Sequence, residues 1–185
     1  MKIAIRILLF AIVVVLGYLT VESVLAPIRY AEEVEKKEAL VIEKLKIIRE
    51  AQMAYLDENG RFTASFDTLV DFMHNGKMSV TIEYGSKDDS TTTFRRETVE
   101  IPVKDSLFKD VDIDNIRYVP LYDTLEFEMG ANTIVKNNVT VPVFQVLDPK
   151  PFSKERQENN DPLKVGSLYE VNYKGNWVTK ATDND

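Results

Sequence analysis

The hydrophobic pattern divides the chain into an apolar beginning, a long segment with helical periodicity and a second half with strand-like alternation. The run Ile7–Val21 contains no charged residue and lies between Arg6 and Glu22. A helix needs about 20 apolar residues to cross a bilayer, and this run reaches that length if the two flanking side chains extend to the membrane surfaces. We therefore expect residues 1–26 to form a transmembrane anchor.

A cleaved signal peptide is the alternative for this segment, since it also combines basic residues with a short apolar core. Its candidate cleavage site follows Ala26, and Pro27 after the cut is a poor context for signal peptidase. For an uncleaved anchor, Lys2 and Arg6 ahead of the span favour a cytoplasmic N-terminus. The expected location is the inner membrane, with the remaining chain in the periplasm.

Glu22 ends the apolar run and has two interpretations. A carboxylate at the edge of a span is either an interfacial residue exposed to water or, in some proteins, a proton relay or assembly contact. Glu22 is therefore a candidate interaction residue of the anchor.

Segment 27–59 has the features of one long helix with a stalk and a spine. Pro27 suits a first helical turn, where its missing N–H is not needed. Over residues 32–38 the charges alternate at i,i+4 spacing with little apolar surface, which predicts a solvated stalk. Further on, apolar residues recur at helical spacing and predict a spine helix that ends at Asn59-Gly60. Its two apolar rows are Val41, Leu45, Ile48, Gln52 and Tyr55, and Leu40, Ile47, Ala51 and Ala54.

Residues 60–185 are predicted to form a short helix followed by an antiparallel β-rich periplasmic domain. Ser65 is a favourable N-cap for a helix over Phe66–Met73, whose apolar positions face one side. The expected fold class is α+β, with an N-terminal transmembrane helix that continues into a long amphipathic helix packed on an antiparallel sheet.

The second half alternates between apolar and polar residues in short runs that are typical of strands. Asn137-Asn138 tolerates positive φ and predicts a tight hairpin turn. Pro102, Pro120 and Pro142 cannot donate to a ladder, so we expect their strands to end there or to lie at an edge. The expected strands are Ser79–Tyr84, Thr93–Val103, Ile116–Pro120, Thr124–Met129, Asn132–Lys136 and Val139–Leu147.

Composition narrows the classes of partner and cofactor. The net charge is −7, so the chain has no bulk attraction for phosphate backbones, and we expect no nucleic-acid partner. The sequence has no cysteine and one histidine, which excludes disulfides, thiolate metal sites and multi-histidine sites. That histidine, His74, lies at a predicted helix end, where it caps carbonyls or is exposed. We therefore expect no catalytic residue and no enzyme.

The acidic run around Asp110, Asp112 and Asp114 is the one candidate metal site, since carboxylate oxygens are calcium ligands. An EF-hand needs a glycine and a bidentate glutamate where this chain has Asn115 and Leu121. A solvated acidic loop is the alternative, and no other cofactor is expected.

The segment that ends the spine helix resembles type IV pilins and the pseudopilins of type II secretion. In those proteins an alanine- and glutamine-containing helix ends in tyrosine, then an Asn-Gly-type turn, Arg with an aromatic residue, and a helix starting D-x-L. A pilin precursor is cut ahead of its apolar helix, but the similar stretch Gly17–Glu22 lies after the apolar run, so we do not expect a polymerising pilin. The matching residues are Arg49, Ala51, Gln52, Tyr55, Asn59, Gly60, Arg61, Phe62, Asp67 and Leu69.

The whole chain also resembles membrane-anchored envelope proteins of Bacteroidota, through the stretches 26–29, 55–72, 103–108, 117–120 and 163–168. Together the resemblances imply a pilin-like soluble part with interaction or anchor residues at Tyr55, Gly60 and Phe62, in addition to Glu22. The expected function is a structural or assembly subunit that binds other envelope proteins. The alternative is a periplasmic binding module that holds a small ligand or cell-wall fragment between helix and sheet.

Overall fold

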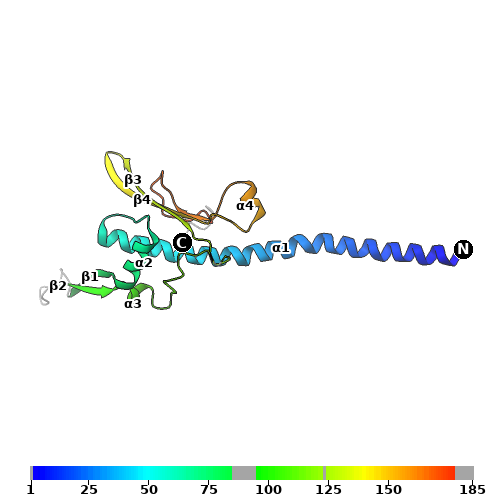
Figure 1. Ribbon diagram of the computed structural model, residues 1–185, viewed down its shortest axis with the longest axis horizontal. Coiled ribbons are helices and arrows are strands. Elements are labelled where there is room, and N and C mark those ends of the chain that lie inside the picture. The colour runs from blue at the N-terminus through cyan, green and yellow to red at the C-terminus, as the bar shows by residue number, and fades with distance from the viewer. Residues whose placement is uncertain (1, 85–94, 123, 178–185) are drawn as a thin grey trace. The chain divides into compact units, whose positions relative to one another are not determined.

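The computed structural model describes residues 2–84, 95–122 and 124–177 (Figure 1). It is an α+β protein with a long N-terminal helix and two small antiparallel sheets, which confirms the expected class. The expected single sheet is wrong, because the strands separate into a pair and a group of three. In chain order the elements are α1 (Lys2–Asn59), α2 (Phe66–Asn75), β1 (Lys77–Tyr84), β2 (Arg95–Pro102), α3 (Val103–Leu107), β3 (Glu128–Lys136), β4 (Val139–Leu147), α4 (Lys154–Glu158) and β5 (Lys164–Gly166).

The chain divides into two compact units, Met1–Ala39 and Leu40–Asp185. The first unit is the N-terminal part of α1. Pro27 lies inside this helix and not in a first turn as we expected, because helix formation already begins at Lys2. Among the described residues, α1 is the one helix that is long and apolar enough to cross a membrane, judged by length and composition. Its large apolar side chains are exposed, which suits contact with hydrocarbon.

The C-terminal part of α1 is the central helix of the second unit. Val41, Leu45, Ile48 and Tyr55 from the predicted apolar row are all buried, so the helical period is confirmed. In the neighbouring row, Ala51 and Ala54 are buried, whereas Ile47 is half-buried and Leu40 is 51% exposed. The hydrophobic core forms around this part of α1, with contributions from α2, from the loop that follows α3, and from β4 and β5.

Helix α1 ends at a left-handed glycine, as predicted. Gly60 has φ +67°, and its N–H donates to the carbonyl of Leu56 at 2.7 Å. Ser65 then caps α2, because its side chain accepts a hydrogen bond from the Thr68 N–H at 3.4 Å. These two local signals turn the chain back so that α2 packs near the end of α1.

Strands β1 and β2 form the predicted antiparallel hairpin, with Lys77 opposite Pro102 and Tyr84 opposite Arg95. Pro102 is the last residue of β2, as its missing N–H requires. Residues 85–94, which connect the two strands in the sequence, lie outside the described part of the chain.

The second sheet has the order β3-β4-β5, with antiparallel neighbours. Two of our strand predictions are wrong here. The expected strand Thr124–Met129 is not a strand of its own, because β3 begins only at Glu128 and then pairs with β4 without interruption through Gly130 to Lys136. The expected strand Ile116–Pro120 provides only an isolated bridge, between Tyr118 and Glu126.

The β3–β4 hairpin has the two-residue turn that the sequence predicts. Asn137 and Asn138 have φ of 52° and 62°, the left-handed values of a type I′ turn. The register places Thr133 opposite Pro142. Pro142 lies beyond the stretch of β4 that pairs with β5, so it occupies an unpaired edge as expected.

Candidate functional site

The structure places Glu22 beside Arg29 on α1. The Glu22 Oε1 and Arg29 Nη1 atoms are 3.5 Å apart, and the side chains are 44% and 65% exposed. An exposed ion pair of this kind contributes little stability but reduces the cost of a charge near hydrocarbon. The geometry fits an interfacial residue, and an assembly contact through Glu22 stays a prediction.

Tyr55 and Phe62 are core residues. The resemblance to pilins implies that they bind a partner protein. Tyr55 is 8% exposed and meets Phe72 edge-on, with ring centroids 5.1 Å apart. Phe62 is 6% exposed and lies 4.6 Å from the Phe144 ring. Gly60 between them provides the left-handed turn. These residues therefore hold α1, the turn and β4 together, and an interaction role for them stays a prediction.

The three candidate calcium ligands are exposed and do not converge. The Asp112 carboxylate accepts a hydrogen bond from the Asn115 side chain at 2.8 Å, and the Asp114 carboxylate lies 3.0 Å from the His74 ring. No group of three or more acidic, histidine or cysteine side chains is placed to hold a metal ion within the part of the chain that the structure describes. The calcium site stays a sequence prediction that this geometry does not favour.

His74 interacts differently from our expectation. Its Nε2 faces Asp114 Oδ1, whereas we expected it to cap the last carbonyls of α2 or to be exposed. The contact joins α2 to the acidic loop, 40 residues further along the chain. We did not predict this contact from the sequence, because the residues around His74 do not indicate a partner 40 positions away.

Lys44 makes a second contact with the acidic loop, in this case from α1. Its Nζ donates to the carbonyls of Asn115 and Tyr118, each at 2.6 Å. Burial lowers the pKa of Lys44, and the nearby Asp112 charge partly opposes that shift. The ammonium group of Lys44 thus holds the acidic loop against α1. The loop that resembles a metal site therefore has a structural contact with the helix.

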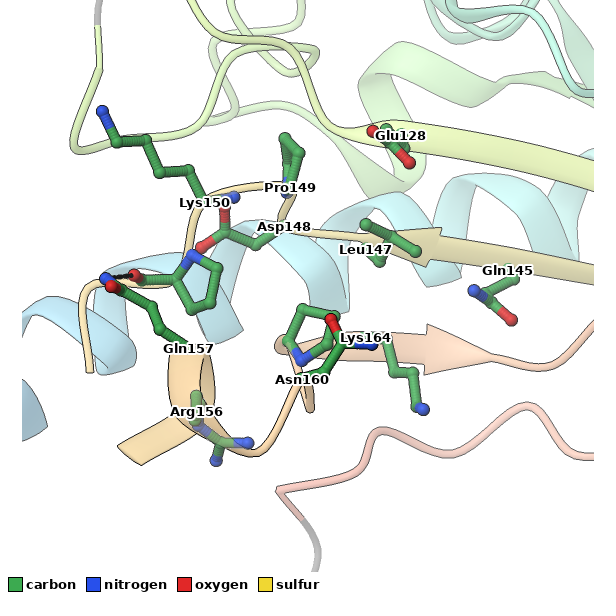
Figure 2. A pocket seen from close by; sticks show the side chains of 12 residues that line it. Glu128, Gln145, Leu147, Asp148, Pro149, Lys150, Arg156, Gln157, Asn160 and Lys164 are labelled. Carbon is green, nitrogen blue, oxygen red and sulfur yellow. Dashed lines mark hydrogen bonds between the residues drawn. The ribbon is translucent and has the colours of Figure 1, made fainter. Parts of the chain in front are cut away.

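The second unit contains a cleft that could hold a small ligand. It lies beside the end of β4, helix α4 and strand β5, and has a volume of about 630 Å³ (Figure 2). That volume falls in the range of about 300–1,000 Å³ that is usual for small-ligand sites. Three prolines shape its wall, and the lining residues are Glu128, Gln145, Leu147, Asp148, Pro149, Lys150, Pro151, Arg156, Gln157, Asn160, Pro162 and Lys164.

Local hydrogen bonds hold the loop around this cleft. Asp148 is 1% exposed, and its Oδ1 accepts from the Lys150 N–H at 2.9 Å. The Gln157 side chain donates to the Pro151 carbonyl at 2.7 Å, as the dashed line in Figure 2 shows. The Ser153 hydroxyl caps α4 by accepting from the Arg156 N–H at 3.4 Å. The loop is therefore ordered by its own side chains.

Three cationic residues, Lys150, Arg156 and Lys164, are among the residues that line the cleft. Lys150 Nζ lies 4.9 Å from the centre of the Tyr122 ring. Arg156 and Lys164 both approach Asp161, at 3.6 and 3.8 Å. With Glu128 at the rim, the lining combines both charges with amide side chains. Such a surface suits a polar ligand that carries an anionic group.

No sequence pattern indicates this cleft directly, because residues 148–162 have the composition of a charged surface loop. The close spacing of Pro149 and Pro151 was the available signal, since prolines restrict a loop to few conformations. Comparison with known protein families, curated proteins and solved structures gives no match to this chain.

Proposed function

We propose that this protein is a non-enzymatic, single-span inner-membrane protein whose second unit is a pilin-like periplasmic domain. In this proposal it is a structural or assembly subunit of an envelope complex of the secretion or transport type. The observation that carries the proposal is helix α1, in which an exposed apolar segment of spanning length and the central core helix of a folded unit belong to one element.

Several contacts support the pilin-like part of the proposal. The resemblance to pilins runs through the end of α1 and the turn after it, and there the residues are tied together. Gln52 binds both backbone polar groups of Thr63, and Phe62 packs under Phe144 of β4. A rigid joint between spine helix, turn and sheet suits a subunit that transmits force or fixes geometry more than it suits a flexible enzyme loop.

The test is purification of the full-length chain from gently solubilised native membranes after mild crosslinking, with expression at its native level. The proposal predicts that the same envelope proteins are recovered in a constant ratio. Recovery of this chain alone would contradict it.

A matched control locates the contacts. In this variant an unrelated single-span helix of the same length replaces residues 1–26, and the rest of the chain is unchanged. The same partners are expected from the second unit if it is the docking module. Loss of the partners only in this variant would place the contacts in the anchor, around Glu22.

A periplasmic binding module is the second candidate, and the cleft beside α4 is the observation that favours it. The ligand expected from the lining is small, polar and anionic, such as a soluble peptidoglycan fragment that carries carboxylates. It would bind between β4, α4 and β5, and not between the sheet and α1 as we first expected.

Calorimetric titration of the full-length protein with soluble peptidoglycan fragments tests this candidate. Lys164→Gln removes a lining cation and is expected to weaken binding by about tenfold, the usual scale for one charge-assisted hydrogen bond. Lys154→Gln on α4 is the matched control, because it removes the same charge from a residue outside the cleft lining. Equal affinities of the two variants, or no binding by the wild type at millimolar fragment, would remove this candidate.

A further inference from the structure

Strand β3 is an edge of the three-stranded sheet, since the strand order is β3-β4-β5. No strand in the described ranges pairs with its outer side. The opposite edge of the same sheet is covered, because the Gly166 N–H donates to the Lys174 carbonyl at 3.1 Å and the Asn176 N–H donates to the Lys164 carbonyl at 3.1 Å. Within the described part of the chain, the sheet therefore has one long open edge.

The hairpin register determines which backbone groups face outward. A two-residue turn makes Lys136 and Val139 a hydrogen-bonded pair, and such pairs then alternate along an antiparallel ladder. Even-numbered residues of β3 therefore bond to β4. The N–H and C=O groups of the intervening residues point to the open edge, and these residues are Met129, Ala131, Thr133 and Val135.

The edge lacks the features that usually prevent pairing. Natural edge strands carry a proline, a bulge or a central charge. Strand β3 has a continuous register with β4, contains no proline, and carries its two charges only at its ends, Glu128 and Lys136. A nine-residue edge with an uncharged centre is a template for another strand.

We propose that β3 pairs antiparallel with β3 of a second copy of this chain, with the two-fold axis at Asn132. In this register the odd-numbered residues meet one another, as the outward hydrogen bonds require: Val135 lies opposite Met129, and Thr133 opposite Ala131. The paired sheets form one continuous six-stranded sheet. The inference goes beyond the proposed function, because it needs this chain alone.

Charge and exposure both favour a second copy as the occupant. The register places Glu128 of one copy opposite Lys136 of the other, and symmetry repeats this pair at the far end. The Val135 side chain is 73% exposed in the single chain and would lie against the half-buried Met129 of the partner. The strand is therefore complementary to itself in charge and in apolar contact.

The chain has no cysteine, so one introduced thiol tests this register directly. In Asn132→Cys, the two thiols lie on the axis in a pair without backbone hydrogen bonds, where Cα atoms are about 4.5 Å apart and a disulfide can form. Val135→Cys is the matched control, because Val135 is exposed on the same strand, as Asn132 is, but lies far from Val135 of the other copy in this register. Both proteins are oxidised as full-length chains in detergent and analysed without reductant.

Asn132→Cys is expected to crosslink faster than Val135→Cys by about tenfold or more, because pairing gives its thiols a high effective concentration. A Val135→Cys rate that equals or exceeds that of Asn132→Cys would overturn the proposal, since exposure alone would then explain the reaction. The native fluorescence of Trp177 confirms that each variant is folded.

A charge exchange gives an independent readout of the same register. Glu128→Lys, made in the Asn132→Cys background, places like charges opposite each other twice and is expected to slow crosslinking by about tenfold. Adding Lys136→Glu restores attraction and is expected to restore the rate. An unchanged rate in the single exchange, or no recovery in the double exchange, would overturn the pairing. Because only this chain is present, neither result depends on the envelope partners proposed above.

Discussion

The side chain of Gln52 forms two hydrogen bonds with the backbone of Thr63. Its Nε2 donates to the Thr63 carbonyl at 2.7 Å, and its Oε1 accepts from the Thr63 N–H at 3.1 Å. Gln52 is fully buried and Thr63 is 9% exposed, so no water replaces either bond. These two hydrogen bonds hold the turn after α1 against the helix. Phe62 of the same turn packs on Phe144 of β4.

Gln52→Met is therefore expected to destabilise the second unit. It leaves a buried N–H and a buried C=O without partners, at a cost of about 2 kcal/mol or more. Glu50→Met on the exposed side of the same helix is the control, with an expected change within about 0.5 kcal/mol. Urea unfolding of the full-length protein in detergent, followed by Trp177 fluorescence, measures both. Similar midpoints for the two variants would contradict this role of Gln52.

Two glycines with positive φ are expected to respond differently to alanine. At Gly166, with φ +78°, a Cβ atom would lie 2.2 Å from the Phe144 carbonyl oxygen, so strain and a backbone clash combine. At Gly60, with φ +67°, nothing lies within 4 Å. We expect Gly60→Ala to cost about 1 kcal/mol from the left-handed conformation alone, and Gly166→Ala to cost clearly more. The same urea unfolding ranks them, and a reversed order would contradict the packing around β5.

Tyr173 gives a pH dependence with a defined sign. Burial raises its pKa above the usual 10.0, and its hydroxyl donates to the Pro142 carbonyl at 2.8 Å. A raised pKa stabilises the fold below about pH 10, and this contribution is lost as the pH rises through the folded-state pKa. Tyr173→Phe is therefore expected to be less stable at pH 8, by about 1 kcal/mol, and to lose less stability than the wild type between pH 9 and pH 11.

Unfolding curves at several pH values test this difference. Comparison with the wild type cancels the opposite slope from Lys44, whose lowered pKa favours the folded state at high pH. Parallel pH profiles for wild type and Tyr173→Phe would show that the Tyr173 hydroxyl is not buried against Pro142.

Membrane anchoring is expected to depend on the apolar part of α1. Val13→Lys together with Leu16→Lys places two charges near the middle of the span, each at a cost of about 3 kcal/mol for insertion. We expect the doubly substituted chain to leave the carbonate-resistant membrane fraction. Val13→Ala with Leu16→Ala is the matched control and should remain there. Retention of the lysine variant would contradict the anchor.

Local sequence signals predicted local structure well. Gly60, Ser65 and the pair Asn137-Asn138 each restrict their own backbone, so the helix end, the cap and the hairpin turn were correct. The apolar row of α1 was correct for the same reason, because burial follows a period that the sequence displays.

Contacts between distant segments were not predictable in this way. Lys44 binds carbonyls that are 71 and 74 residues away. Every residue has a backbone carbonyl, so the sequence does not show which one accepts a hydrogen bond. Gly130 lies within the continuous strand β3 and has the Leu168 side chain beside it, and no local signal pairs these two residues. The cleft depends on such pairings as well, so the candidate site emerged only from the structure.

The most direct test of the central claim is the composition of the complex that contains the full-length chain in native membranes. Quantitative mass spectrometry after mild crosslinking and gentle solubilisation measures it, with the anchor-replaced chain in parallel. The account predicts that both chains recover the same envelope proteins in a constant ratio to this chain. Recovery of this chain only as a monomer or as copies of itself would contradict a role as an assembly subunit.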